Sequence, residues 1–70
     1  MEILIVDDEL MMLEMAEDTV SEAVSDADIV TESDPYEALE VAKRKHFDVA
    51  MLDIEMPGMT GLELAKKLKS

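Results

Sequence analysis

The chain has 70 residues, of which 49% are hydrophobic, so it can form one small packed domain and does not have the composition of a disordered tail. Eighteen acidic residues against six basic ones give a formal net charge of −12. Such a charge repels nucleic acid and anionic membrane surfaces, so we expect no contact with either, and it favours divalent cations and basic protein surfaces.

Cysteine and long apolar segments are both absent from the sequence. Without cysteine, disulfides and thiolate metal sites are excluded. The longest apolar runs, such as 3–6 and 49–52, have about four residues, whereas a membrane span needs about 20. A secretory signal would need a basic leader, but Glu2 leads directly into a strand pattern. We therefore expect a soluble protein located in the cytoplasm.

The first part of the chain predicts a strand, a helix and a second strand. Residues 3–6 are apolar at every position, which is typical of a strand buried on both faces of a parallel sheet. Residues 10–24 predict an amphipathic helix, and residues 28–31 predict a shorter, more polar strand at a sheet edge. The predicted inward stripe of this helix comprises Leu13, Ala16, Val20 and Ala23.

A second helix is expected from Asp34 to about Lys45. Asp34 can act as its N-cap, Pro35 fits the first helical position, and Glu37 stands where a capping box requires it. The basic residues at 43–45 are favourable at the negative C-terminal end of a helix. The predicted inward-facing residues are Ala38, Leu39 and Ala42.

A third strand and a third helix follow. Residues 47–52 predict the strand, which is apolar from Val49 onward, and the breaker residues at 56–59 predict a loop. Thr60 and Glu63 form a second capping-box pattern, so a helix is expected from there to the end of the chain. The predicted inward stripe of this helix comprises Leu62, Ala65 and Leu68.

Strands that alternate with helices predict an α/β fold, here a three-stranded parallel sheet with right-handed crossovers and three helices. Asp7 and Asp8 follow the first strand, and Asp53 follows the third. Because parallel strands point the same way, their carboxyl ends lie at one edge of the sheet, where ligand sites of open α/β sheets are found. We therefore expect these three side chains to converge.

Three converging carboxylates favour a metal ion. Two unit charges about 4 Å apart repel by roughly 4 kcal/mol at an effective dielectric of 20, so a bound cation would relieve the cluster. A donor set of carboxylates without histidine or cysteine suits Mg²⁺, or Mn²⁺, better than zinc or copper. Each aspartate alone also fits a helix N-cap, and it is the joint pattern that favours a site.

Two segments resemble the response-regulator receiver family. Residues 3–9, Ile-Leu-Ile-Val-Asp-Asp-Glu, resemble the opening of such domains. Residues 48–61, Asp-Val-Ala-Met-Leu-Asp-Ile-Glu-Met-Pro-Gly-Met-Thr-Gly, resemble their phosphoacceptor strand and loop, and the separation of the two segments also fits. The resemblance covers the whole chain and implies a flavodoxin-like fold of the chemotaxis-regulator type, with the three strands in the order 2-1-3.

The resemblance also implies roles for single residues. Asp53 would be the nucleophile that accepts a phosphoryl group from the phosphohistidine of a sensor histidine kinase or phosphotransfer protein. Pro57 and Gly58 would shape the loop that presents a main-chain carbonyl to the metal. The implied Mg²⁺ ligands are Asp7 (largely through water), Asp8, Asp53 and the main-chain carbonyl of Glu55.

Receiver domains have five strands in the order 2-1-3-4-5, whereas this chain ends after the third helix. We therefore expect residues 1–70 to be a truncated receiver domain that lacks the last two strands and their helices. The fourth-strand Ser or Thr and the fifth-strand Lys that contact the phosphoryl group would then be missing. The basic residues at 66–69 are expected to be solvated on a helix, and do not replace that Lys.

The order 2-1-3 leaves the third strand at an edge of the sheet, although its sequence is that of a central strand. An exposed apolar edge is a template for pairing with another chain. We therefore predict that the fold is completed by homodimerisation. The predicted dimer edge comprises Val49, Ala50, Met51 and Leu52.

Three functions stay open at this point. The first is a phosphoacceptor module of two-component signalling, which is not itself an enzyme. The second is a non-enzymatic half-domain that acts as a homodimerising unit. The third is a small Mg²⁺-dependent phosphatase, a class that also uses a strand-end aspartate as nucleophile. The third is favoured least, because Glu55 stands where that class has a second aspartate.

Overall fold

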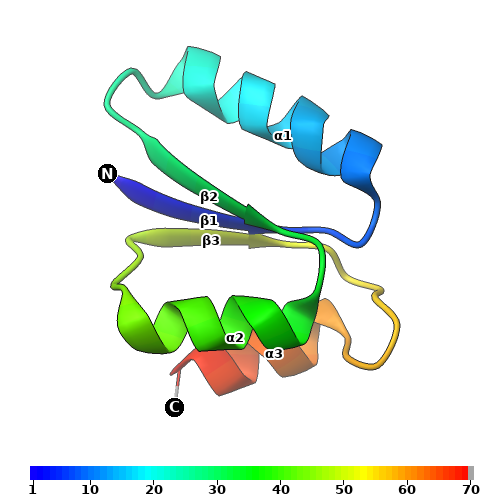
Figure 1. Cartoon of the computed structure of the whole chain (residues 1–70). Helices are drawn as coiled ribbons and strands as arrows, with labels where there is room; N and C mark the ends of the chain where they lie inside the picture. Colours follow the sequence, from blue (N-terminus) through cyan, green and yellow to red (C-terminus); the bar gives the residue numbers. More distant parts are fainter. Residues whose placement is uncertain (70) are drawn as a thin grey trace.

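The computed structural model describes residues 1–69, and strands alternate with helices along them as predicted (Figure 1). The elements are β1 (Glu2–Val6), α1 (Leu10–Ala23), β2 (Asp28–Glu32), α2 (Pro35–Arg44), β3 (Val49–Leu52) and α3 (Gly61–Lys69). Each element lies within two residues of its predicted bounds, except that Ser70 falls outside the described residues. None of the helices described within residues 1–69 is long and apolar enough to cross a membrane.

The sheet is parallel, with the strand order β2-β1-β3. This order confirms the prediction 2-1-3 and places β1 at the centre. In the register of the sheet, Val6 of β1 pairs with Glu32 of β2 and with Leu52 of β3. All three strands therefore end at the same level, and the residues that follow them share one edge.

The helices form two layers around the sheet: α1 covers one face, and α2 and α3 cover the other (Figure 1). Alternate residues of β1 supply both faces, and all four of its residues from Ile3 to Val6 are at most 3% exposed. The core on the α1 side comprises Ile3, Ile5 and Leu13. The core on the other side comprises Leu4, Val6, Ala38, Met56, Met59 and Leu64.

Side-chain caps begin the two helices that follow β2 and β3. The Asp34 carboxylate accepts a hydrogen bond from the Tyr36 N–H at 2.9 Å, as expected of an N-cap. Among the described residues Glu37 makes no bond back to Asp34, so that capping box is only half formed. Thr60 and Glu63 form the complete box, because the Thr60 N–H donates to the Glu63 carboxylate at 3.0 Å and the Glu63 N–H donates to the Thr60 hydroxyl at 3.1 Å.

Two side chains of the predicted helix stripes face solvent instead of the core. Leu62 is 71% exposed, whereas Leu64 is completely buried. Two residues along a helix turn through about 200°, so the burial of Leu64 forces Leu62 to the opposite side. Leu68, one turn further, packs against the core as predicted. Ala23, the last residue of α1, is exposed as well.

β3 forms an exposed edge of the sheet, as the strand order required. By register Val49 and Met51 lie on the α1 face beside Ile3 and Ile5. They are 41% and 43% exposed, because α1 packs over β1 and β2 and does not reach β3. The homodimer expected from this edge stays a prediction.

Candidate functional site

The hydrogen-bond ladder of the sheet continues past the strand ends and holds the backbone of two aspartates. The Asp53 N–H donates to the Val6 carbonyl at 2.9 Å, and the Asp7 N–H donates to the Glu32 carbonyl at 3.2 Å. Because Val6 pairs with Leu52, the next residues on the two strands, Asp7 and Asp53, stand side by side. The sheet itself therefore sets the separation of the two backbone positions that carry these carboxylates.

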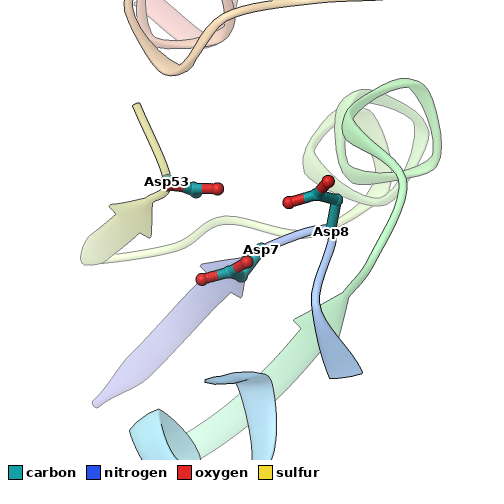
Figure 2. A group of neighbouring side chains, drawn as sticks. All are labelled: Asp7, Asp8 and Asp53. Carbon is teal, nitrogen blue, oxygen red and sulfur yellow. The ribbon is translucent and has the colours of Figure 1, made fainter. Parts of the chain in front are cut away.

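Asp7, Asp8 and Asp53 form an acidic cluster at this edge. Each offers a carboxylate oxygen, and these oxygens all lie within 4.8 Å of one another. Figure 2 shows the side chains of Asp8 and Asp53 pointing toward one another, with the Asp7 carboxylate beside them at the end of β1. Asp8 is exposed, while Asp7 and Asp53 are half-buried. The convergence expected from parallel strands is thus what the structure shows.

The chemistry of the cluster fits a hard divalent cation. All its ligands are carboxylate oxygens, the donors that Mg²⁺ and Mn²⁺ prefer. The Asp7 carboxylate accepts a hydrogen bond from the Glu9 N–H at 3.0 Å, which orients the side chain and leaves its second oxygen for a water or a cation. Solvent around Asp8 weakens the repulsion between the carboxylates but does not remove it.

An open depression of about 450 Å³ lies over the cluster. Its lining residues are Asp8, Glu9, Asp53, Ile54 and Glu55. Glu55 therefore borders the same space as two of the aspartates, which is where its main-chain carbonyl would have to be to reach a cation. Coordination by that carbonyl stays a prediction.

The loop after Glu55 contains a tight turn at residues 56–59. The Met59 N–H donates to the Met56 carbonyl at 3.3 Å, and Gly58 has a φ of +82°. Pro57 followed by a glycine with positive φ is the pattern of a type II turn. Met56 and Met59 are 7% and 3% exposed, so the two ends of the turn are anchored in the core and its tip faces solvent.

Two residues that the sequence did not predict as part of the site, Gly61 and Tyr36, hold this region. The Gly61 N–H donates to the Ile54 carbonyl at 2.8 Å, which closes the loop against the first turn of α3. The Tyr36 hydroxyl donates to the Gly58 carbonyl at 2.9 Å, which joins α2 to the tip of the turn. A glycine at the start of a helix is a signal for close packing, whereas no local pattern predicts the partner of a tyrosine on another helix.

Basic residues and the single histidine lie away from the cluster. The lysines of α3 occupy its last turn, at the end that points away from the carboxyl edge of the sheet (Figure 1). His46 is exposed and lies 3.6 Å from the Asp48 carboxylate, before β3 begins. The placement of the lysines agrees with the solvated position expected for the basic residues at 66–69.

Comparison with known proteins identifies a protein family that this chain matches. The family model of the response regulator receiver domain matches residues 3–70. The chemotaxis protein CheY4 of Vibrio cholerae superposes with a TM-score of 0.87 at 35% identity, over 97% of this chain and 55% of that one. A chain in the crystal structure of histidine kinase ThkA in complex with response regulator protein TrrA superposes with a TM-score of 0.85 at 37% identity, over 97% and 57%.

Similar sequences occur within longer curated proteins. Stress response regulator protein 1 of Debaryomyces hansenii is 39% identical over 94% of this chain and 27% of its own length. A protein-glutamate methylesterase/protein-glutamine glutaminase of Hydrogenovibrio crunogenus is 39% identical over 94% of this chain and 18% of its own length. The chain thus matches the N-terminal part of longer homologues, and it spans about half the length of the solved chains.

Proposed function

The chain belongs to the response regulator receiver family, and on that premise we propose that Asp53 is the phosphoacceptor of a two-component signalling system. One observation carries the proposal: the carboxylate of Asp53 lies within 4.8 Å of those of Asp7 and Asp8 at the carboxyl edge of the sheet. An acidic cluster at this position is typical of the phosphoacceptor site of the family.

In the proposed reaction an oxygen of the Asp53 carboxylate attacks the phosphorus of a phosphohistidine. The new O–P bond forms while the N–P bond breaks, and the electron pair returns to the imidazole nitrogen, which then takes a proton from solvent. The product is an aspartyl phosphate on this chain, so the chain is an acceptor and not a turnover enzyme. The open depression beside Asp53 gives an incoming phosphoryl group room to approach.

The acidic cluster would hold Mg²⁺. Without a bound cation, its three carboxylates would repel an incoming phosphoryl anion. The proposed ligands are the carboxylates of Asp8 and Asp53, the main-chain carbonyl of Glu55 and, through water, Asp7. The bound ion supplies positive charge that offsets the carboxylates and the phosphoryl oxygens. Asp7 suits an indirect role because the Glu9 N–H already occupies one of its oxygens.

The proposed donor is a sensor histidine kinase or a phosphotransfer protein. Support comes from the solved complex of histidine kinase ThkA with response regulator protein TrrA, which contains a chain 37% identical to this one. A phosphohistidine on such a partner supplies both the phosphoryl group and an imidazole leaving group. The cognate kinase and its signal are properties of the whole signalling system.

The test is the intact mass of the full chain after incubation with Mg²⁺ and acetyl phosphate. We expect one phosphoryl adduct that depends on Mg²⁺. Asp53→Asn should abolish the adduct, whereas the matched control Asp18→Asn, an exposed aspartate of α1 outside the cluster, should keep it. A folded chain without an adduct, or an adduct that survives in Asp53→Asn, would refute the proposal. Sustained hydrolysis of a phosphate ester would favour the phosphatase alternative instead.

The exposed edge of β3 favours a second proposed function, homodimerisation. Within residues 1–69, β3 pairs with β1 on one side, and its outer side presents an apolar edge made of Val49, Ala50, Met51 and Leu52. A second copy related by a two-fold axis would pair its own β3 with this edge and bury the exposed side chains of both strands. In this alternative the chain acts as an interaction unit, whether or not Asp53 is phosphorylated.

Light scattering over a range of concentrations tests the dimer. Met51→Lys should shift the chain to the monomer, because a lysine at 43% exposure on the edge opposes strand pairing. Met11→Lys, at a 72% exposed methionine of α1, makes the same change of charge away from β3 and should leave the mass unchanged. A wild-type chain that stays a compact monomer at every concentration excludes this function.

A further inference from the structure

We propose that Tyr36 is a positioning residue, which holds the loop between β3 and α3 (residues 54–60) in the shape that presents Glu55 to the acidic cluster. The inference rests on the proposed function and names a residue that acts on its metal site from another element. Tyr36 belongs to the first turn of α2, 22 residues before the glycine that it contacts. The hydrogen bonds of its N–H and hydroxyl among residues 1–69 are to Asp34 and Gly58 and not to the three aspartates of the cluster, so its effect would pass through the loop.

The contact between Tyr36 and Gly58 combines a hydrogen bond with close packing. The hydroxyl of Tyr36 donates to the main-chain carbonyl of Gly58 at 2.9 Å. A β-carbon built on Gly58 would stand 3.3 Å from Cε2 of the tyrosine ring and 3.5 Å from its hydroxyl oxygen. The tyrosine ring therefore lies directly against the turn, at Gly58, the position that has no side chain.

The tyrosine is itself held in place at the start of α2. Its N–H donates to the Asp34 carboxylate at 2.9 Å, and the preceding Pro35 is buried. Pro at the first helical position and a capping aspartate define the direction in which the helix begins. The hydroxyl is thus presented from a fixed helix end.

The loop has three anchors, and Tyr36 is the one at its tip. The Gly61 N–H bonds to the Ile54 carbonyl and closes the base of the loop. Met56 and Met59 are buried and hold the two ends of the turn. Gly58 is exposed, and within residues 1–69 the hydrogen-bond donor to its carbonyl is the Tyr36 hydroxyl.

Loss of the hydrogen bond between Tyr36 and Gly58 would lower the fraction of molecules in which the loop has the conformation that binds Mg²⁺. Glu55 lies between the closed base and the turn, and it borders the depression over Asp8 and Asp53. When only a fraction of molecules has the loop in the binding shape, the apparent dissociation constant rises by the inverse of that fraction. A net contribution typical of one hydrogen bond corresponds to about a two- to tenfold weakening of Mg²⁺ binding.

The test is a calorimetric titration of the full chain with Mg²⁺, combined with amide hydrogen exchange in the metal-free protein. Tyr36→Phe keeps the ring and removes only the hydroxyl. Thr19→Val is the matched control, because the Thr19 hydroxyl also donates to a main-chain carbonyl at 2.9 Å, that of Met15, but within α1. Tyr36→Phe should weaken Mg²⁺ binding about two- to tenfold and speed the exchange of the Met59 amide, while Thr19→Val should change neither.

The outcomes separate this inference from the proposed function. A wild-type chain that binds Mg²⁺ and a Tyr36→Phe variant that binds it equally tightly would overturn the inference and leave the proposed function standing. Weaker binding without faster exchange of the Met59 amide would also overturn it, because the hydroxyl would then act other than by holding the loop. A folded wild-type chain that binds no Mg²⁺ would overturn the proposed metal site and, with it, the inference.

Discussion

A β-carbon on Gly61 would stand 2.1 Å from the main-chain oxygen of Asp53. The first residue of α3 therefore packs directly on the backbone of the proposed phosphoacceptor. The atom that blocks a side chain there belongs to the main chain, which cannot move aside as a flexible side chain can. This approach, together with the bond from the Gly61 N–H to the Ile54 carbonyl, ties the start of α3 to the end of β3.

Gly61→Ala should destabilise the fold, although alanine favours helices. The gain in helix propensity is about 1 kcal/mol, whereas overpacking against a rigid neighbour costs about 1–3 kcal/mol. At 2.1 Å from a main-chain oxygen the steric cost is at the upper end of that range, so we expect a net loss of about 1–2 kcal/mol. Urea unfolding measures it. An unchanged or higher free energy of unfolding would mean that α3 can shift away from Asp53.

Asp8→Asn should stabilise the metal-free chain and remove the stabilisation by Mg²⁺. Replacing one of three clustered carboxylates relieves repulsion, by about 1 kcal/mol or less at an exposed position. In the wild type, Mg²⁺ at about 100 times its dissociation constant should add about 2.7 kcal/mol. Thermal unfolding with and without Mg²⁺ measures both effects, and Asp18→Asn serves as the control. The same response to Mg²⁺ in Asp8→Asn would exclude Asp8 as a ligand.

Leu64→Ala and Leu62→Ala should differ sharply, although the residues are two positions apart. Leu64 is fully buried between α2 and the sheet, so its truncation leaves a cavity and should cost about 2–5 kcal/mol. Leu62 is 71% exposed, and its truncation should change the free energy of unfolding by about 0.5 kcal/mol or less. Denaturant unfolding of the two variants is the measurement. Comparable losses would show that α3 is rotated relative to the fold described above.

The Thr60–Glu63 capping box should make the start of α3 sensitive to acid. The hydrogen bond from the Thr60 N–H, and after it the Thr60 hydroxyl, hold the pKa of Glu63 below its usual value of 4.5. Because the folded pKa lies below the unfolded one, the contribution is fully present above pH 4.5 and disappears as the pH falls through the folded value. An NMR titration of the Glu63 carboxyl should show this lowered midpoint.

A variant of the cap separates its two causes. Thr60→Val keeps the main-chain N–H and removes the hydroxyl, so the pKa of Glu63 should rise part of the way toward 4.5 and remain below it. Complete return to 4.5 would assign the whole effect to the hydroxyl. A wild-type midpoint at or above 4.5 would contradict the capping geometry altogether.

Much of the fold could be predicted from local patterns. The apolar run of β1, the alternation of strands and helices, and the caps at Asp34 and Thr60 depend on residues that are close in the sequence, and the structure has all of them. The convergence of the acidic cluster was predictable too, because parallel strands of equal register end at the same edge. Motif resemblance added the strand order, which alternation alone does not determine.

Which residues form the sheet and which aspartates meet at its edge could thus be inferred from the amino-acid order, since both follow from short-range periodicity and from the direction of parallel strands. Three features became visible only in the folded chain: Leu64 faces the core in place of Leu62, Gly61 touches Asp53, and Tyr36 reaches Gly58. These contacts depend on how helices rotate and pack against partners distant in the chain. Packing of that kind is a sum over many neighbours, and no short stretch of sequence contains it.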